Sequence, residues 1–238
     1  MTVVQPAALY AASRYPVRPD LAEAHAAWRA HLASPGTWWT AAQRVAFIGS
    51  LWAALDDPEP LAPWSAPSTV PGRIPPGGTL LPAAHDLAYR LARHAATTTE
   101  SWYRSMHDAL GGAGPFVELA ALAATGMAVA TFGPALGIDR PALPAPGPGE
   151  PSRHLPDVRP ATMNWVPVTG EPDALPAVVQ ALSAVPAEHA MQWRLAAAQY
   201  MAGPDMVHLD WQRAGSPLHR RQLELVAARL SLHRQCFY

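Results

Sequence analysis

The stretch Ser216–Tyr238, with the sequence SPLHRRQLELVAARLSLHRQCFY, carries the residues on which the predicted fold and function depend. Ser216 is a suitable N-cap residue, and Pro217 suits the first position of a helix. The apolar residues that follow at i, i+3, i+4 and i+7 lie on one helical face: Leu223, Val226, Ala227 and Leu230. The sequence therefore predicts a final helix over Ser216–Tyr238 with this face buried.

Two residues of this stretch can carry chemistry, and each has two interpretations. Glu224 is either a partly buried carboxylate that accepts a proton from a thiol, or the partner of Arg220 or Arg221 in an ordinary ion pair. Cys236, twelve positions later (236 − 224), is the only cysteine. It is either half of a redox pair whose thiol pKa is lowered at a helix start, or an isolated thiol on a frayed terminus.

The combination of Glu224 with Cys236-Phe237-Tyr238 resembles part of the Glu, C-x-x-C, His pattern of the alkylhydroperoxidase-like, or carboxymuconolactone decarboxylase-like, superfamily. The resemblance extends over Thr40–Tyr238, through Ser101-Trp102-Tyr103, Phe116-Val117-Glu118 and Trp165-Val166-Pro167. It implies an all-α, duplicated alkylhydroperoxidase-like helical fold with a Pro-rich linker. It also implies catalytic roles for Cys236 and Glu224 in a thiol-dependent peroxidase, an antioxidant protein.

In this superfamily the second residue of the C-x-x-C pair attacks peroxide, and that position would follow Tyr238. Some relatives carry selenocysteine there, encoded by UGA. We therefore hypothesise that the chain is truncated within the motif, at a UGA read as a stop; a naturally shortened paralogue is the alternative. The resemblance then implies an enzyme only if the motif is completed beyond residue 238, and weak or no activity without it.

Other functions stay open at this point. The first alternative is a non-catalytic helical protein that oligomerises and acts as a binding or scaffold protein, and the second is a thiol-independent decarboxylase of the same superfamily. For the peroxidase, the expected partners are a peroxide or another small-molecule substrate and a dithiol reductant. We also expect a homo-oligomer, because relatives associate and because only 15% of the residues are charged, which leaves apolar helix faces to cover.

Composition excludes several classes of site. All 17 basic residues are arginine, so no Schiff-base or P-loop lysine exists. No two histidines lie three or four residues apart and there is one cysteine, so we expect no metal site, and no motif indicates a cofactor. A net charge of −1 gives no reason to expect nucleic acid or an anionic membrane surface as a partner.

The location of the protein is predicted from two segments. The N-terminal sequence MTVVQPAALYAASRYP lacks the basic and apolar regions of a signal peptide. The uncharged stretch Leu119–Ile138 is long enough for a bilayer, but it is rich in Ala, Gly and Thr, so we interpret it as a buried helix. A soluble, cytoplasmic protein is expected.

The chain divides into three portions. We expect an N-terminal helical portion over residues 1–138, a Pro-rich linker over 139–174 and a C-terminal helical portion over 175–238, which can pack as one domain. Helices are predicted over 20–32, 41–55 after the N-cap Thr40, 83–97, 100–110, from Pro115 onward, 175–183 and 187–201; residues 58–82 form a Pro-rich loop.

A weak internal repeat supports the duplication. FVELAALAATGMAVATF (116–132) and QLELVAARLSLHRQCF (222–237) both place a glutamate third in an Ala-rich helix. Glu118 thus corresponds to Glu224, and Ala130 takes the position of Cys236. Glu118 has no arginine within four residues and lies in a more apolar context, and a structural role is favoured for it. His233 lies on the far side of the last helix from Glu224, and we assign it no role.

Overall fold

The computed structural model describes residues 5–57, 78–234 and 236 of the chain, and helices dominate these ranges. The all-α class is therefore confirmed. The α-helices are α1 (Pro19–Leu32), α2 (Ala41–Leu55), α3 (Pro82–His94), α4 (Glu100–Leu110), α5 (Ala113–Ala135), α6 (Ala177–Gln180), α7 (Pro186–Gln199) and α8 (Arg220–His233). Short 3-10 turns occupy η1 (Pro6–Tyr10), η2 (Ala95–Thr97) and η3 (Gly203–Val207), and β1 (Val158–Arg159) pairs antiparallel with β2 (Val168–Thr169).

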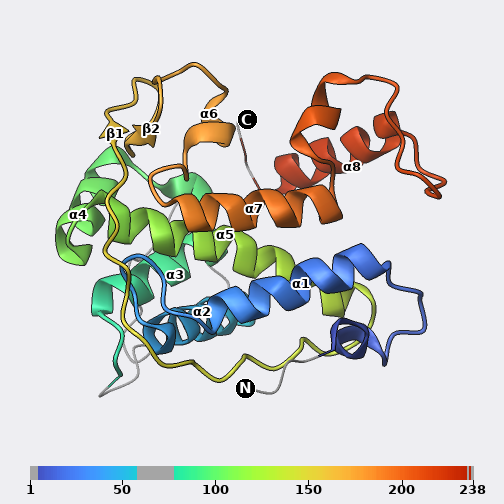
Figure 1. The fold of residues 1–238 in the computed structure, drawn as a ribbon, viewed down its shortest axis with the longest axis horizontal. Coiled ribbons are helices and arrows are strands. Elements are labelled where there is room, and N and C mark those ends of the chain that lie inside the picture. The colour runs from blue at the N-terminus through green and yellow to red at the C-terminus, as the bar shows by residue number, and fades with distance from the viewer. Residues whose placement is uncertain (1–4, 58–77, 235, 237–238) are drawn as a thin grey trace.

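Helix α5 runs through the middle of the molecule (Figure 1). It contacts α2, α3, α4 and α7, and Glu118 is its only charged residue. A helix that is apolar on all sides is stable only where other elements cover it, which explains the central place of α5. By length and composition it could also cross a membrane, but 67% of its most apolar window is buried inside the protein. The predicted buried helix is confirmed; the cytoplasmic location stays a prediction.

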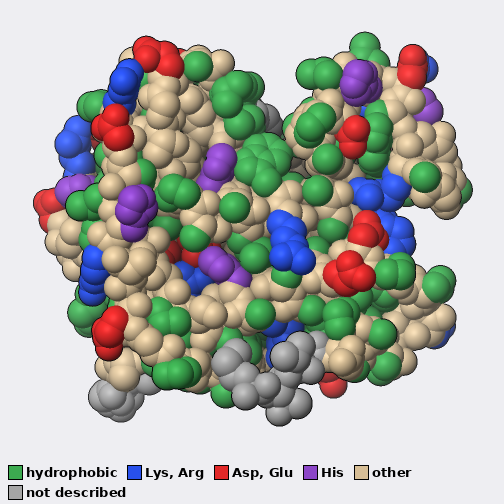
Figure 2. Space-filling model, viewed as in Figure 1, with side chains coloured by type: hydrophobic (Ala, Val, Ile, Leu, Met, Phe, Trp, Pro, Cys, Tyr) green, Lys and Arg blue, Asp and Glu red, His purple; other side chains and the backbone are tan. Residues whose placement is uncertain are grey.

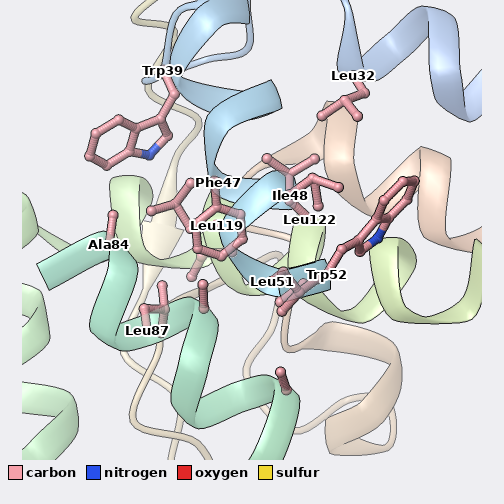
Figure 3. Packing of buried hydrophobic residues seen from close by; sticks show 14 of the residues in the cluster. Leu32, Trp39, Phe47, Ile48, Leu51, Trp52, Ala84, Leu87, Leu119 and Leu122 are labelled. Carbon is pink, nitrogen blue, oxygen red and sulfur yellow. The ribbon is translucent and has the colours of Figure 1, made fainter. Parts of the chain in front are cut away.

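The core is formed where α2 and α3 pack on α5 (Figure 3). Leu51 of α2, Leu87 of α3 and Leu119 of α5 are completely buried there. Gly126 lets α2 approach α5 closely, because a Cβ atom at this position would lie 2.6 Å from Cδ1 of Ile48. Close approach of this kind removes apolar surface from water, and each Å² of apolar surface buried stabilises the fold by about 25 cal/mol.

Local signals predicted several helix limits well. Thr40 and Gln43 form a capping box at the start of α2, in which Oγ1 of Thr40 accepts from the Gln43 amide at 3.3 Å. Helix α4 covers the predicted range and ends at Gly111, whose φ of +88° suits glycine. Helix α5 begins at Ala113, so Pro115 lies in its first turn. There the missing N–H of a proline breaks no intrahelical hydrogen bond.

The predicted linker packs on the helical body of the protein. Residues 139–157 form neither helix nor strand and follow the surface (the yellow trace in Figure 1). The amides of Gly147, Ser152 and Arg153 donate to the carbonyls of Ala33 (2.7 Å), Gly36 (3.1 Å) and Thr37 (2.9 Å). After the short β pair, α7 packs against α1 and α5. The predicted loop over residues 58–82 lies outside the described residues up to position 77.

Helix α8 differs from its prediction in limits and in burial. The hydroxyl of Ser216 accepts from the backbone amide of Leu218 instead of capping a helix, and the side chain of His219 caps α8 three residues later than expected. The helix ends at His233.

The predicted buried face of α8 was wrong. Val226 is 66% exposed and Leu230 is 61% exposed, and no residue of α8 is buried. Hydrophobic side chains are visible on the lobe that carries this helix, which stands apart from the main body (Figures 1 and 2). Periodicity identified an apolar face correctly, but burial also needs a second element to pack on it.

Candidate functional site

Four side chains from four helices form a buried charged group, here called the Arg44 cluster: His31 of α1, Arg44 of α2, Glu118 of α5 and Glu188 of α7. The side chains of Arg44, Glu118 and Glu188 are 0% exposed, whereas that of His31 is 18% exposed. Charged residues are rarely buried this completely unless they are paired. In the described part of the chain, this cluster is therefore a candidate functional site.

Arg44 is the centre of the cluster. Its Nη1 donates to Oε1 of Glu118 and to Oε1 of Glu188, each at 2.7 Å. Its Nη2 donates to the backbone oxygen of His31 at 3.2 Å, while Nε2 of that histidine lies 2.7 Å from Oε1 of Glu188. The backbone amide of Trp38 donates to Oε2 of Glu118 at 2.6 Å. One guanidinium thus connects both carboxylates, and both receive a second donor.

The loop between α1 and α2 closes one side of the cluster. A Cβ atom at Gly36 would lie 1.8 Å from Oε1 of Glu118 and 2.1 Å from Nη1 of Arg44. Only glycine can occupy this position without displacing the ion pair. The extended segment covers this loop, since Ser152 donates to the carbonyl of Gly36.

The two carboxyl groups differ electrostatically. Burial raises the pKa of Glu118, and the neighbouring Glu188 adds to this rise, against the lowering effect of Arg44. For Glu188, burial also acts to raise the pKa, but hydrogen bonding with His31 and the charge of Arg44 together hold it below its ordinary value. Of the two carboxyl groups, Glu118 therefore takes up a proton more readily than Glu188.

This arrangement suits two tasks, structural and chemical. It joins α1, α2, α5 and α7 through charge-assisted hydrogen bonds, which are stronger than neutral ones. Two carboxyl groups with divergent pKa shifts are also the usual setting of acid–base chemistry. His31 is the one member of the cluster with some exposure, at 18%.

The predicted site residues lie elsewhere, on and just beyond α8. Glu224 pairs with Arg220, whose Nε lies 3.1 Å from its Oε1, so the ion-pair interpretation describes its contact. The Glu224 side chain is 44% exposed. Burial and the neighbouring Glu224 carboxylate raise the pKa of Tyr200 to about 12.

Cys236 is exposed, and its amide donates to the carbonyl of Ser231 at 2.9 Å in the turn after α8. The thiol therefore follows the end of the helix that carries Glu224. Neither of these two residues is among the hydrogen-bond partners of the Arg44 cluster, which come from α1, α2, α5, α7 and the loop between α1 and α2.

The two glutamates of the internal repeat have opposite environments. Glu118 is fully enclosed and bound by an arginine from another helix, whereas Glu224 is half-exposed and bound by an arginine of its own helix. Helix α5 also continues through Ala130, which is completely buried, whereas α8 ends before the corresponding Cys236. The repeat in sequence is thus not matched by equal surroundings.

The sequence prediction missed Arg44, Glu188 and His31 and favoured a structural role for Glu118. One signal was present: Arg44 is the only charge of α2 and Glu118 the only charge of α5. Two apolar helices with one charge each, of opposite sign, must solvate those charges mutually if both helices are buried. Nothing in sequence spacing marked His31 or Glu188.

Neither a search for metal-binding geometry nor comparisons with known proteins indicate a function for this chain. Within residues 5–57, 78–234 and 236, no group of three or more His, Cys, Asp or Glu side chains is arranged to hold a metal ion. No protein-family model, curated protein or solved structure matches this chain.

Proposed function

We propose that the chain is an alkylhydroperoxidase-like, thiol-dependent peroxidase of the antioxidant type, in which Cys236 is the resolving thiol. The observation that carries the proposal is the exposed thiol directly after the helix that bears Glu224, twelve positions along the chain. This agrees with the Glu and C-x-x-C order of the superfamily that the sequence resembles. In that superfamily the attacking thiol or selenol stands three positions after the resolving one.

The proposed chemistry balances with a peroxide and a dithiol. The attacking thiolate or selenolate cleaves the O–O bond, forms a sulfenic or selenenic acid and releases an alcohol or water. Cys236 then condenses with this product, releasing one water and forming a disulfide or selenenylsulfide. An external dithiol reduces that bond. Glu224, beside Arg220, accepts the thiol proton.

Kinetic assays test the proposal directly. Peroxide reduction is measured with dithiothreitol for three forms: the 238-residue chain, a form with one cysteine and the downstream reading frame added after Tyr238, and the same extended form carrying Cys236→Ser. We expect little activity from the first, clear turnover from the second and loss of turnover in the third. An extended form without activity, or with activity that Cys236→Ser leaves intact, contradicts the assignment.

The codon after position 238 tests the selenocysteine version. A UGA followed by an open frame with a histidine a few codons on supports it, and UAA or UAG ends it. A selenol is ionised at neutral pH, whereas a thiol with a pKa of about 8.5 is mostly protonated. A cysteine in place of selenocysteine should therefore give a slower enzyme with the same dependence on Cys236.

The second candidate is a non-catalytic helical protein that forms homo-oligomers and binds partners. It is favoured by the exposed apolar side chains of α8, Leu225, Val226, Leu230 and Leu232, which are 61–69% exposed. Sedimentation at micromolar concentration is expected to show a species heavier than the 25.4 kDa chain. An oligomer without peroxidase activity in the extended form would favour this candidate, and a monomer would count against it.

A further inference from the structure

A surface cavity lies between α4, the start of α5 and the loops around β1 and β2, outside the Arg44 cluster. Its volume is about 450 Å³, within the range of small-molecule pockets. Eight residues line it: Tyr103, Arg104, His107, Asp108, Ala113, Pro160, Trp165 and Pro167. Neither Glu224 nor Cys236 is among them, so what this cavity binds is independent of the proposed peroxidase function.

One wall of the cavity is aromatic. The rings of Tyr103 and Trp165 are stacked, with centroids 6.1 Å apart and planes 25° from parallel. Phe116 fixes Tyr103 from behind in an edge-on contact at 5.0 Å. Tyr103 is 7% exposed, whereas Trp165 is 50% exposed. A half-exposed indole beside two prolines offers a planar ring an apolar surface to stack on.

The other wall favours a negatively charged group. Arg104 lies on it, in an exposed pair with Glu100, which is not a lining residue. His107 contacts Asp108 through its Nδ1 at 2.9 Å; with the Nδ1 proton directed at that carboxylate, Nε2 of a neutral ring is an acceptor and does not bind an anion. That contact also engages the one carboxylate of the lining, which lies 83% exposed at the rim.

The start of α5 adds to this polarity. Ala113, the first residue of α5, lines the cavity, and the first turn of this helix contains no acidic residue. The positive end of the helix dipole therefore lacks a neutralising carboxylate of its own. It supplements the arginine side chain of this wall.

We propose that this cavity binds a planar aromatic carboxylate. The ring stacks on Trp165 between the prolines, and the carboxylate is held by Arg104 near the start of α5. Stacking requires a flat ring, and the cation of Arg104 requires an anion. The site thus selects for both features together.

Isothermal titration calorimetry with three probes separates these requirements: naphthalene-2-carboxylate, naphthalene-2-methanol, which lacks the charge, and cyclohexanecarboxylate, which lacks the planar ring. We expect the first to bind the full chain about tenfold more tightly than either of the others. Equal binding of all three, or no binding of naphthalene-2-carboxylate at millimolar concentration, overturns the proposal.

Variants then locate the binding. Trp165→Ala and Arg104→Gln are each expected to weaken naphthalene-2-carboxylate about tenfold, and Trp165→Phe to restore most of the loss. Met163→Ala is the matched control, because Met163 lies in the same segment, is 74% exposed and does not line the cavity. Far-UV circular dichroism checks that each variant is folded. A Met163→Ala effect equal to that of Trp165→Ala contradicts the assigned location.

Discussion

Arg44 is enclosed in protein, and its interactions show how much one residue can contribute to an α-helical core. Its guanidinium is shared by two carboxylates at 2.7 Å each, with a third contact to the carbonyl of His31. Removing one charge from such a group leaves the others buried and uncompensated. The cost of that change is larger than the net stabilisation of an intact pair.

We predict that Arg44→Met lowers the free energy of unfolding by about 3–5 kcal/mol, because two buried carboxyl groups then lose their common cation. Urea unfolding followed by circular dichroism measures the change. Arg104→Met is the control, since the Arg104–Glu100 pair is exposed at 72% and 52%, and such pairs contribute at most about 1 kcal/mol. Equal effects of the two substitutions would show that the buried ion pairs of Arg44 contribute no more to stability than an exposed pair.

The same cluster can be tested from the backbone side at Gly36. Gly36→Ala places a methyl group 1.8 Å from Oε1 of Glu118, so the ion pair must move. We expect a loss of more than about 2 kcal/mol in the free energy of unfolding, of the size found for overpacked interiors.

Gly203→Ala provides the matched control for that substitution. A Cβ atom at Gly203 meets nothing within 4 Å, and no positive φ is recorded for this residue. Its effect on stability should stay within about 1 kcal/mol and is expected to be stabilising. A mild effect at Gly36 as well would mean that the loop between α1 and α2 yields easily.

At the scale of elements, α2 and α8 show that similar patterns lead to different burial. Both helices carry apolar residues at helical spacing and both begin with a capping box. Helix α2 packs against α3 and α5, and its Leu51 is 0% exposed. Helix α8 leaves Leu230 61% exposed. The difference lies in the neighbouring elements, not in the helix.

This contrast predicts the outcome of two equal substitutions. Leu51→Ala should lower the free energy of unfolding by about 2–5 kcal/mol, because it leaves a cavity in the core. Leu230→Ala should change it by no more than about 0.5 kcal/mol, as is usual for surface positions. Thermal and urea unfolding measure both. A loss at Leu230 as large as that at Leu51 would show that this face of α8 is covered in solution.

At the scale of the whole molecule, a second buried group connects the N-terminal residues to the later helices. His25 of α1 is completely buried, contacts the hydroxyl of Tyr10 and lies 2.8 Å from the side-chain amide of Gln199. Phe132 of α5 packs edge-on against the imidazole ring at 4.9 Å. Four elements, η1, α1, α5 and α7, therefore meet at one neutral imidazole.

Stability is expected to depend on pH through this residue. Burial lowers the pKa of His25 from 6.5 to about 4, so the unfolded chain binds a proton in a range where the folded protein does not. The contribution is complete above about pH 6.5 and declines as the pH falls toward 4, by up to about 3 kcal/mol.

Unfolding measured in steps between pH 7 and pH 4.5 tests this expectation against His25→Gln. The variant should be less stable at pH 7 but should lose less stability on acidification. Burial also lowers the pKa values of His85 and His94, so the difference between the two proteins, not the slope of either, reports on His25. Parallel curves would exclude His25 as a source of the acid sensitivity.

The sequence by itself determined the helical class and most helix limits, because these depend on neighbouring residues. Thr40, the residues 100–110 and the glycine after them act through capping, periodicity and backbone freedom, all of which are local. The apolar composition of α5 likewise required that it be buried, and it is.

Only the tertiary structure decided which polar residues meet and which apolar faces are covered. His31, Arg44, Glu118 and Glu188 are separated by up to 157 positions in the chain, and no local spacing relates them. The apolar face of α8 was readable, but its exposure depends on what packs beside it. Interactions between neighbouring residues determine where helices form. Which buried charges pair, and which apolar faces are covered, depends on how distant elements pack.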